Sequence, residues 1–167
     1  CVTGGGRGIG RATAEALAAR GARVVIGDLD LHHGEEVARG IGGGAVALKL
    51  DVADPESFAA FIAEAERLGP VNLLVNNAGI MRTGVFAEQT LHTQHREIAI
   101  NLGGVVTGMR LVLPGMLERD RGHIVNVASM AGKMSVPGAA VYTATKFGVA
   151  SLSRAVRAEI VKSKVTI

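Results

Sequence analysis

The chain has 167 residues, 48% of them hydrophobic and 20% charged, which is enough for one globular domain with a substantial core. Its net charge of +3 comes from 18 Lys and Arg scattered among 15 Asp and Glu, and without a basic cluster we expect no nucleic-acid partner. An uninterrupted membrane-spanning apolar run, an export signal and a disulfide framework are all absent from the pattern, with Cys1 the single cysteine, so we expect no membrane partner and a cytoplasmic location.

Short apolar runs alternate along the chain with segments of helical periodicity. The apolar runs lie at 23–28, 44–50, 71–77 and 122–129, and the helical patterns at 11–21, 55–69 and about 90–119. Asp54 and Pro55 suit the cap and first turn of the middle helix. This alternation predicts a parallel sheet covered by helices on both faces. Because CVTGGG resembles a strand's end and KVTI a strand's start, we expect one domain over residues 1–167 that is cut at both ends.

The glycine-rich stretch TGGGRGIG, residues 3–10, lies between the end of a strand and the start of a helix. Glycines let the backbone turn sharply and approach phosphates, and the free N–H groups and dipole of the helix attract an anion. We therefore predict a pyrophosphate-binding turn whose residues are Gly4, Arg7, Gly8, Ile9 and Gly10. A surface turn without a ligand is the alternative, and a nucleoside-triphosphate loop is not indicated, because no Gly-Lys-Ser/Thr follows.

Asp28 ends the second predicted strand, eighteen residues after Gly10. A carboxylate at this place accepts hydrogen bonds from ribose hydroxyls and repels a 2′-phosphate, which favours NAD over NADP. Arg7 favours NADP instead, because its guanidinium could bind the 2′-phosphate. We give Asp28 the greater weight and predict NAD, with NADP as the alternative and an ordinary turn aspartate left open.

The only tyrosine, Tyr142, is followed one helical turn later by Lys146. Tyrosine has an ordinary pKa of about 10 and is a poor base near neutrality, but a neighbouring ammonium favours its ionised form. We therefore predict Tyr142 as a general acid and base, with Lys146 making its hydroxyl more acidic and binding the second ribose of the cofactor. Ser129 ends the fifth predicted strand, where its hydroxyl could hold the substrate oxygen beside Tyr142.

Several other residues are weaker candidates. Asn101 precedes Gly103 and Gly104, which predicts a break in the helix and an ordered water there, although a kink without chemistry is the alternative. His92 and His95 lack a further ligand, so no metal site is predicted. His32 and His33 are expected to lie in a solvated loop or at the start of a helix. The sequence allows two interpretations equally, lining a substrate pocket or packing in an apolar core, for Met130, Met134, Val136, Pro137 and Val141.

Taken together, these motifs resemble the short-chain dehydrogenase/reductase family in its standard form. The shared motifs are TGGGRGIG, the strand end at Asp28, Asp51-Val52, NNAG at 76–79, Asn101, Ser129, and Tyr142 with Lys146. The resemblance implies a Rossmann-type α/β/α fold with strand order 3-2-1-4-5-6-7, the last strands being missing or incomplete here. It also implies a catalytic tetrad, which consists of Asn101, Ser129, Tyr142 and Lys146. The residues that it implies as cofactor contacts are Asp51, Val52, Asn77, Ala78 and Gly79.

The resemblance further implies a nicotinamide cofactor and a reaction between an alcohol and a carbonyl. We expect an NAD-dependent oxidoreductase that interconverts a small secondary alcohol and a ketone, as a homodimer or homotetramer. An NADPH-dependent ketoreductase, such as a 3-oxoacyl thioester reductase, and a non-catalytic cofactor-binding protein are the alternatives. Asn72 departs from the family, which often has an acidic residue there, and the family's Pro-Gly motif after the sixth strand lies beyond residue 167.

Overall fold

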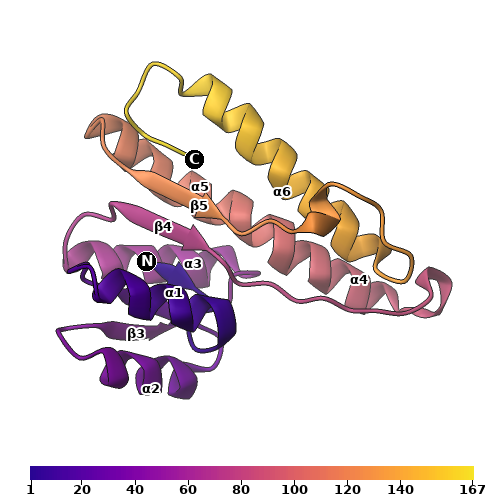
Figure 1. Ribbon diagram of the computed structural model, residues 1–167, viewed down its shortest axis with the longest axis horizontal. Coiled ribbons are helices and arrows are strands. Elements are labelled where there is room, and N and C mark those ends of the chain that lie inside the picture. The colour runs from indigo at the N-terminus through magenta and orange to yellow at the C-terminus, as the bar shows by residue number, and fades with distance from the viewer.

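The computed structural model describes residues 1–167, which form one parallel sheet of five strands in the order β3-β2-β1-β4-β5 (Figure 1). The strands are β1 (Val2–Thr3), β2 (Val25–Asp28), β3 (Val46–Lys49), β4 (Leu73–Asn76) and β5 (His123–Asn126). The α/β class and the first five positions of the predicted strand order are confirmed. Beyond β5, Thr166 forms a single parallel bridge with His123.

Six α-helices and three short helical turns connect the strands. The α-helices are α1 (Gly8–Ala18), α2 (Leu31–Ile41), α3 (Pro55–Arg67), α4 (Leu91–Ile98), α5 (Gly104–Glu118) and α6 (Ala140–Glu159). The short turns are the 3₁₀ turns η1 (Phe86–Glu88) and η3 (Met130–Gly132) and the π-helical turn η2 (Ala99–Gly103). As predicted, Asp54 caps α3, because its side chain accepts a hydrogen bond from the N–H of Glu56 at 3.0 Å.

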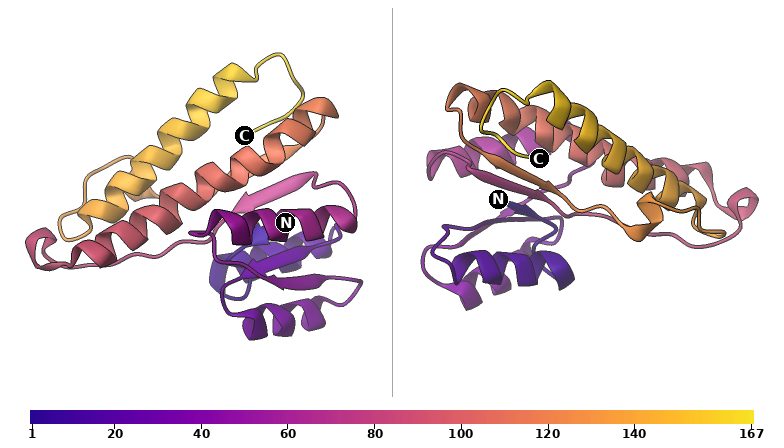
Figure 2. Two further views of the ribbon diagram at one scale, coloured as in Figure 1. Left: turned by 180° about the vertical axis from the view of Figure 1, so that it is seen from behind. Right: turned by 45° about the horizontal axis from the view of Figure 1, so that its top comes forward.

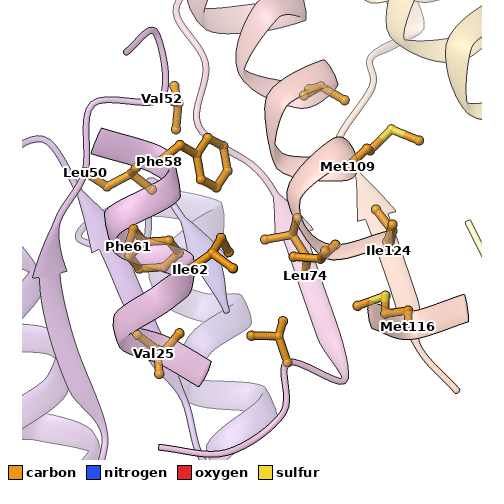
Figure 3. Packing of buried hydrophobic residues seen from close by; sticks show 14 of the residues in the cluster. Val25, Leu50, Val52, Phe58, Phe61, Ile62, Leu74, Met109, Met116 and Ile124 are labelled. Atoms are coloured by element: carbon orange, nitrogen blue, oxygen red, sulfur yellow. The ribbon is translucent and has the colours of Figure 1, made fainter. Parts of the chain in front are cut away.

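Helices cover both faces of the sheet (Figure 2). Side chains from α3 and α5 join the larger apolar cluster (Figure 3), together with side chains from α6. Side chains from α1 and α2 join the smaller one. Neighbouring residues of one strand belong to different clusters, since Leu74 packs in the larger and Val75 in the smaller. This explains why the strands are apolar at successive positions, as strands buried on both sides require.

The sequence pattern does not predict helix α2, although it allows a helix to start at His32 and His33. Its cap is Asp30, which accepts a hydrogen bond from the N–H of His33. Gly34 interrupts the apolar pattern because it lies against the sheet, where a Cβ atom would be 3.2 Å from the Cβ of Ala47. A position that periodicity assigns to an apolar side chain is therefore a glycine, which hides the helix from pattern analysis.

The segment Leu91–Glu118, which comprises α4, η2 and α5, is long and apolar enough to cross a membrane by length and composition. Its buried side chains Val105, Met109, Val112 and Met116 belong to the larger apolar cluster. The core helix of a soluble protein meets the same criterion, and this one packs against α3, β4 and β5. We therefore treat it as a core helix.

Candidate active site

A cleft of about 620 Å³ opens where the strands of the sheet end at their carboxyl termini. Open parallel sheets bind their ligands at this edge. The cleft is bordered by the glycine turn, by the segments that follow β2, β3, β4 and β5, and by α6. All the predicted site residues line it except Gly10 and Asn101.

The glycine turn between β1 and α1 has the backbone geometry that a phosphate site needs. Gly4 and Gly8 have φ angles of +62° and +52°, which favour glycine, and no side chain caps the first N–H groups of α1. Gly10 does not line the cleft and lies against the backbone of the same turn. A Cβ atom there would be 2.1 Å from the carbonyl oxygen of Gly4, so Gly10 allows close packing of helix and turn.

Asp28 is buried at the end of β2 and is held by two backbone groups. Its Oδ2 accepts a hydrogen bond from the N–H of Gly6 at 2.8 Å, and its Oδ1 accepts one from the N–H of Asp30 at 3.0 Å. The carboxylate is thereby fixed at the wall of the cleft. A second hollow of about 600 Å³ adjoins Asp28 and contains both acidic and basic groups. The residues that line it are Arg7, Asp28, Leu29, Asp30, Leu31 and Lys49.

Asn77 ties the end of β4 to the glycine turn. Its Nδ2 donates hydrogen bonds to the carbonyl oxygens of Thr3 at 2.9 Å and Gly4 at 3.1 Å. In return, the hydroxyl of Thr3 accepts from the N–H groups of Asn77 and Ala78, each at 3.0 Å. These bonds hold together the two central strands whose ends form the middle of the cleft.

Tyr142 and Lys146 lie one turn apart on α6, and both face the cleft. The ammonium of Lys146 is 5.7 Å from the centroid of the Tyr142 ring and donates a hydrogen bond to the carbonyl oxygen of Val127 at 2.7 Å. Burial lowers the pKa of Lys146 below its ordinary value of 10.5. Ser129 lines the same end of the cleft, where its Oγ accepts from the N–H of Ala131 at 3.1 Å.

Asn101 lies in the π-helical turn η2, so the predicted break in the helix is present. Its side chain pairs with the backbone of Ile80, with Nδ2 donating to the carbonyl at 2.7 Å and Oδ1 accepting from the N–H at 2.8 Å. Nδ2 also lies 3.3 Å from the hydroxyl of Thr145. These hydrogen bonds fix the amide against the segment that follows β4, and the ordered water stays a prediction.

Some lining residues were not predicted. Those that directly follow a strand carry a usable signal, because ligands bind beyond strand ends, and they are Leu29, Leu50, Val127 and Ala128. Ile80 and Met81 extend the NNAG segment, whereas Arg96 and Ile100 come from the helix and have no local signal.

The weaker candidates lie elsewhere. The group Met130, Met134, Val136, Pro137 and Val141 does not line the cleft. His92 and His95 are exposed, and no group of three or more metal-binding side chains occurs in the chain.

Comparison with known proteins supports a common family. The family model described as short chain dehydrogenase matches residues 1–167. The 2,5-dichloro-2,5-cyclohexadiene-1,4-diol dehydrogenase of Sphingobium indicum is 36% identical over 99% of this chain and 68% of its own length. A 3-alpha-(or 20-beta)-hydroxysteroid dehydrogenase of Mycobacterium tuberculosis is 36% identical over 99% of this chain and 64% of its own. A 3-oxoacyl-[acyl-carrier-protein] reductase of Bos taurus is 38% identical over 99% of this chain and 70% of its own length.

Solved structures agree with this assignment. A short-chain dehydrogenase/reductase from Burkholderia phymatum in complex with NAD matches with a TM-score of 0.96 and 31% identity, over 99% of this chain and 61% of that one. A metagenomic short-chain oxidoreductase in complex with NADP matches with a TM-score of 0.93 and 35% identity, over 98% of this chain and 76% of that one. The chain thus spans about two thirds of the length of its relatives. These neighbours support NAD or NADP as the ligand of the cleft, and the chain belongs to the short-chain dehydrogenase family.

Proposed function

We propose that this chain is an NAD-dependent oxidoreductase that interconverts a secondary alcohol and a ketone. The observation that carries the proposal is the composition of one continuous cleft. The glycine turn and Asp28 border it on one side, and Ser129, Tyr142 and Lys146 border it on the other. A dinucleotide has the matching chemistry, because its phosphates suit free N–H groups and its adenosine ribose suits a carboxylate.

The residues at the catalytic side have complementary roles. A bound nicotinamide would supply the hydride acceptor in oxidation and the hydride donor in reduction. In oxidation, the ionised Tyr142 oxygen accepts the proton from the alcohol oxygen, and in reduction the Tyr142 hydroxyl returns that proton to the carbonyl oxygen. The ammonium of Lys146 lies 5.7 Å from the centroid of the Tyr142 ring, so its positive charge is beside the group that exchanges this proton. Ser129 donates a hydrogen bond to the substrate oxygen and holds it beside Tyr142.

The preference for NAD rests on the acidic groups around the ribose end of the cleft. Asp28 is fixed there by two backbone hydrogen bonds, and Asp30 lies in the same adjoining hollow. The backbone N–H of His33 lowers the pKa of Asp30, so that carboxyl group is ionised at neutral pH. Arg7 and Lys49 also line the hollow and favour the opposite choice, an NADPH-dependent ketoreductase. We favour NAD because Asp28 is the buried and immobilised charge.

A small-molecule substrate and self-association complete the proposal. Relatives are named for a chlorinated cyclohexadienediol and for hydroxysteroids, which supports a cyclic or bulky secondary alcohol. Ile98, Val106 and Phe147 are exposed apolar side chains on α4, α5 and α6, and a second copy of the chain could cover them. Light scattering combined with size-exclusion chromatography would show a dimer or tetramer, and a monomer would contradict this part.

Cofactor titration and turnover together test the proposed function. Calorimetric titration with NAD⁺ and NADP⁺ is expected to show tighter binding of NAD⁺, and a panel of secondary alcohols is expected to be oxidised. Tyr142→Phe should reduce turnover about a thousandfold, as for loss of a general acid or base, with cofactor binding retained. Turnover that survives in Tyr142→Phe would refute the mechanism, and binding of NADP⁺ about tenfold tighter would refute the cofactor preference.

A further inference from the structure

Glu97 in α4 is a fully buried carboxylate that no functional motif includes. Its side chain is 0% exposed, yet only one of its oxygens is satisfied. Oε1 accepts a hydrogen bond from the backbone N–H of Arg82 at 3.0 Å, and Oε2 has no partner. A buried polar group without a partner destabilises a fold, so an apolar residue would stabilise this position better. The contact with Arg82 is the only specific interaction that Glu97 makes.

Glu97 acts on the same backbone segment as Asn101, one helical turn further on. Asn101 pairs with both the N–H and the carbonyl of Ile80, and Glu97 receives the N–H of Arg82. Residues 77–83 follow β4 without forming a helix or a strand, so no regular backbone pairing holds them. The N–H groups of Ile80 and Arg82 are fixed instead by two side chains of one helix.

This segment forms the wall of the cleft at its catalytic side. Ile80 and Met81 line the cleft, and a Cβ atom on Gly79 would lie 3.9 Å from the ammonium of Lys146. The segment follows β4, whereas Asp28 ends β2 on the far side of β1. A shift of residues 79–81 would therefore alter the catalytic side of the cleft and leave the ribose end near Asp28 in place.

We propose that Glu97 is a positioning residue that sets the Ile80–Met81 wall against the nicotinamide half of the dinucleotide. The inference rests on the proposed function, because it assumes that the cleft holds this ligand. It implies that Glu97 controls affinity for the nicotinamide half and has no influence on the adenosine half.

Two ligands and two variants of Glu97 separate this role from a merely structural one. The ligands are NAD⁺ and ADP-ribose, which lacks the nicotinamide, and both are titrated by calorimetry. Glu97→Met removes the acceptor and should weaken NAD⁺ binding about tenfold, the factor that corresponds to one lost hydrogen bond of about 1.4 kcal/mol. Its affinity for ADP-ribose should equal that of the wild type. Glu97→Gln keeps a carbonyl oxygen for the Arg82 N–H and should restore NAD⁺ binding.

A second pair of variants tests the donor of the same hydrogen bond. Arg82→Pro removes the N–H and should weaken NAD⁺ binding, whereas Arg82→Ala removes only the exposed side chain and should not. This pair decides the matter if Glu97→Met fails to fold. Equal NAD⁺ binding by Glu97→Met and wild type, or by Arg82→Pro and Arg82→Ala, would overturn the inference alone. A wild-type chain that binds neither ligand would overturn the proposed function and the inference with it.

Discussion

Lys146 donates a hydrogen bond from its Nζ to the carbonyl oxygen of Val127 across 2.7 Å, which joins α6 to the segment after β5. The side chain is only 5% exposed, and the partner is a neutral carbonyl. The side-chain nitrogen is therefore partly desolvated, with no carboxylate paired with it, 5.7 Å from the Tyr142 ring centroid. This arrangement serves the chemistry of the phenol at some cost in stability.

That cost can be measured as a dependence of stability on pH. Burial lowers the pKa of Lys146 in the folded chain, so the unfolded chain binds the proton more tightly. The cost is complete below the folded pKa and disappears as pH rises through it towards 10.5. Lys146→Met should therefore be most favoured relative to wild type at neutral pH, with the difference changing in favour of wild type at higher pH. Urea unfolding of both proteins at several pH values tests this, and a constant difference would contradict it.

The glycine turn allows two causes of glycine dependence to be separated. Gly10→Ala would place its Cβ 2.1 Å from a backbone oxygen, so we expect unfolding to become easier by about 3 kcal/mol and dinucleotide binding to be lost. Gly8→Ala meets no atom within 4 Å and only has to adopt a φ of +52°, which costs about 1.5 kcal/mol. Thermal or urea unfolding measures both variants. Equal destabilisation would show that the close approach at Gly10 is not the cause.

The charge of Asp28 should decide between the two cofactors. Asp28→Asn keeps an oxygen that can accept from the N–H of Gly6 but removes the negative charge. We expect the ratio of NADP⁺ to NAD⁺ affinity to rise about tenfold, because repulsion of the 2′-phosphate is relieved. Asp30→Asn is the comparison variant and should raise the ratio less, since Asn caps α2 equally well and the Asp30 side chain is more exposed. An unchanged ratio in Asp28→Asn would assign the preference to other residues.

A chain of side-chain hydrogen bonds, which starts at the buried Asn76, links β4, β5 and α6. Asn76 donates to Oδ1 of Asn126 at 2.8 Å, and Nδ2 of Asn126 donates to the hydroxyl of Ser153 at 2.9 Å. Oδ1 of Asn76 already lacks a partner, so Asn126→Ala would leave the whole Asn76 amide unsatisfied. We expect a loss of about 2 to 3 kcal/mol in unfolding free energy, against about 1 kcal/mol for Ser153→Ala. Similar losses for the two variants would refute the importance of the Asn76 contact.

Much of the architecture was predictable because its causes are local. Successive apolar residues such as Leu74 and Val75 identify strands buried on both faces, and glycines at Gly4 and Gly8 identify a turn with positive φ angles. The helical spacing of Tyr142 and Lys146 places both side chains in one cleft before any contact is known. In each case a short stretch of sequence contains both the signal and its structural consequence.

The parts that were missed depend on partners far along the chain. Gly34 looks like a helix breaker until Ala47 is seen against it. The pairing of Asn101 with Ile80 and of Glu97 with Arg82 crosses intervals of 21 and 15 residues. No local pattern predicts which backbone N–H group a buried side chain will meet.

The π-helical turn has a mechanical consequence for the long helix that contains it. Buried positions follow one another at intervals of four from Glu97 through Asn101 and Val105 to Met109. In a uniform helix of 3.6 residues per turn, this stripe would wind progressively around the axis. The looser winding at Ala99–Gly103 offsets that drift and keeps the buried positions on one side of the long helix. Deleting a single amino acid from this turn would rotate α4 against α5, so that a shortened chain of nearly identical composition would lose the alignment of its buried positions.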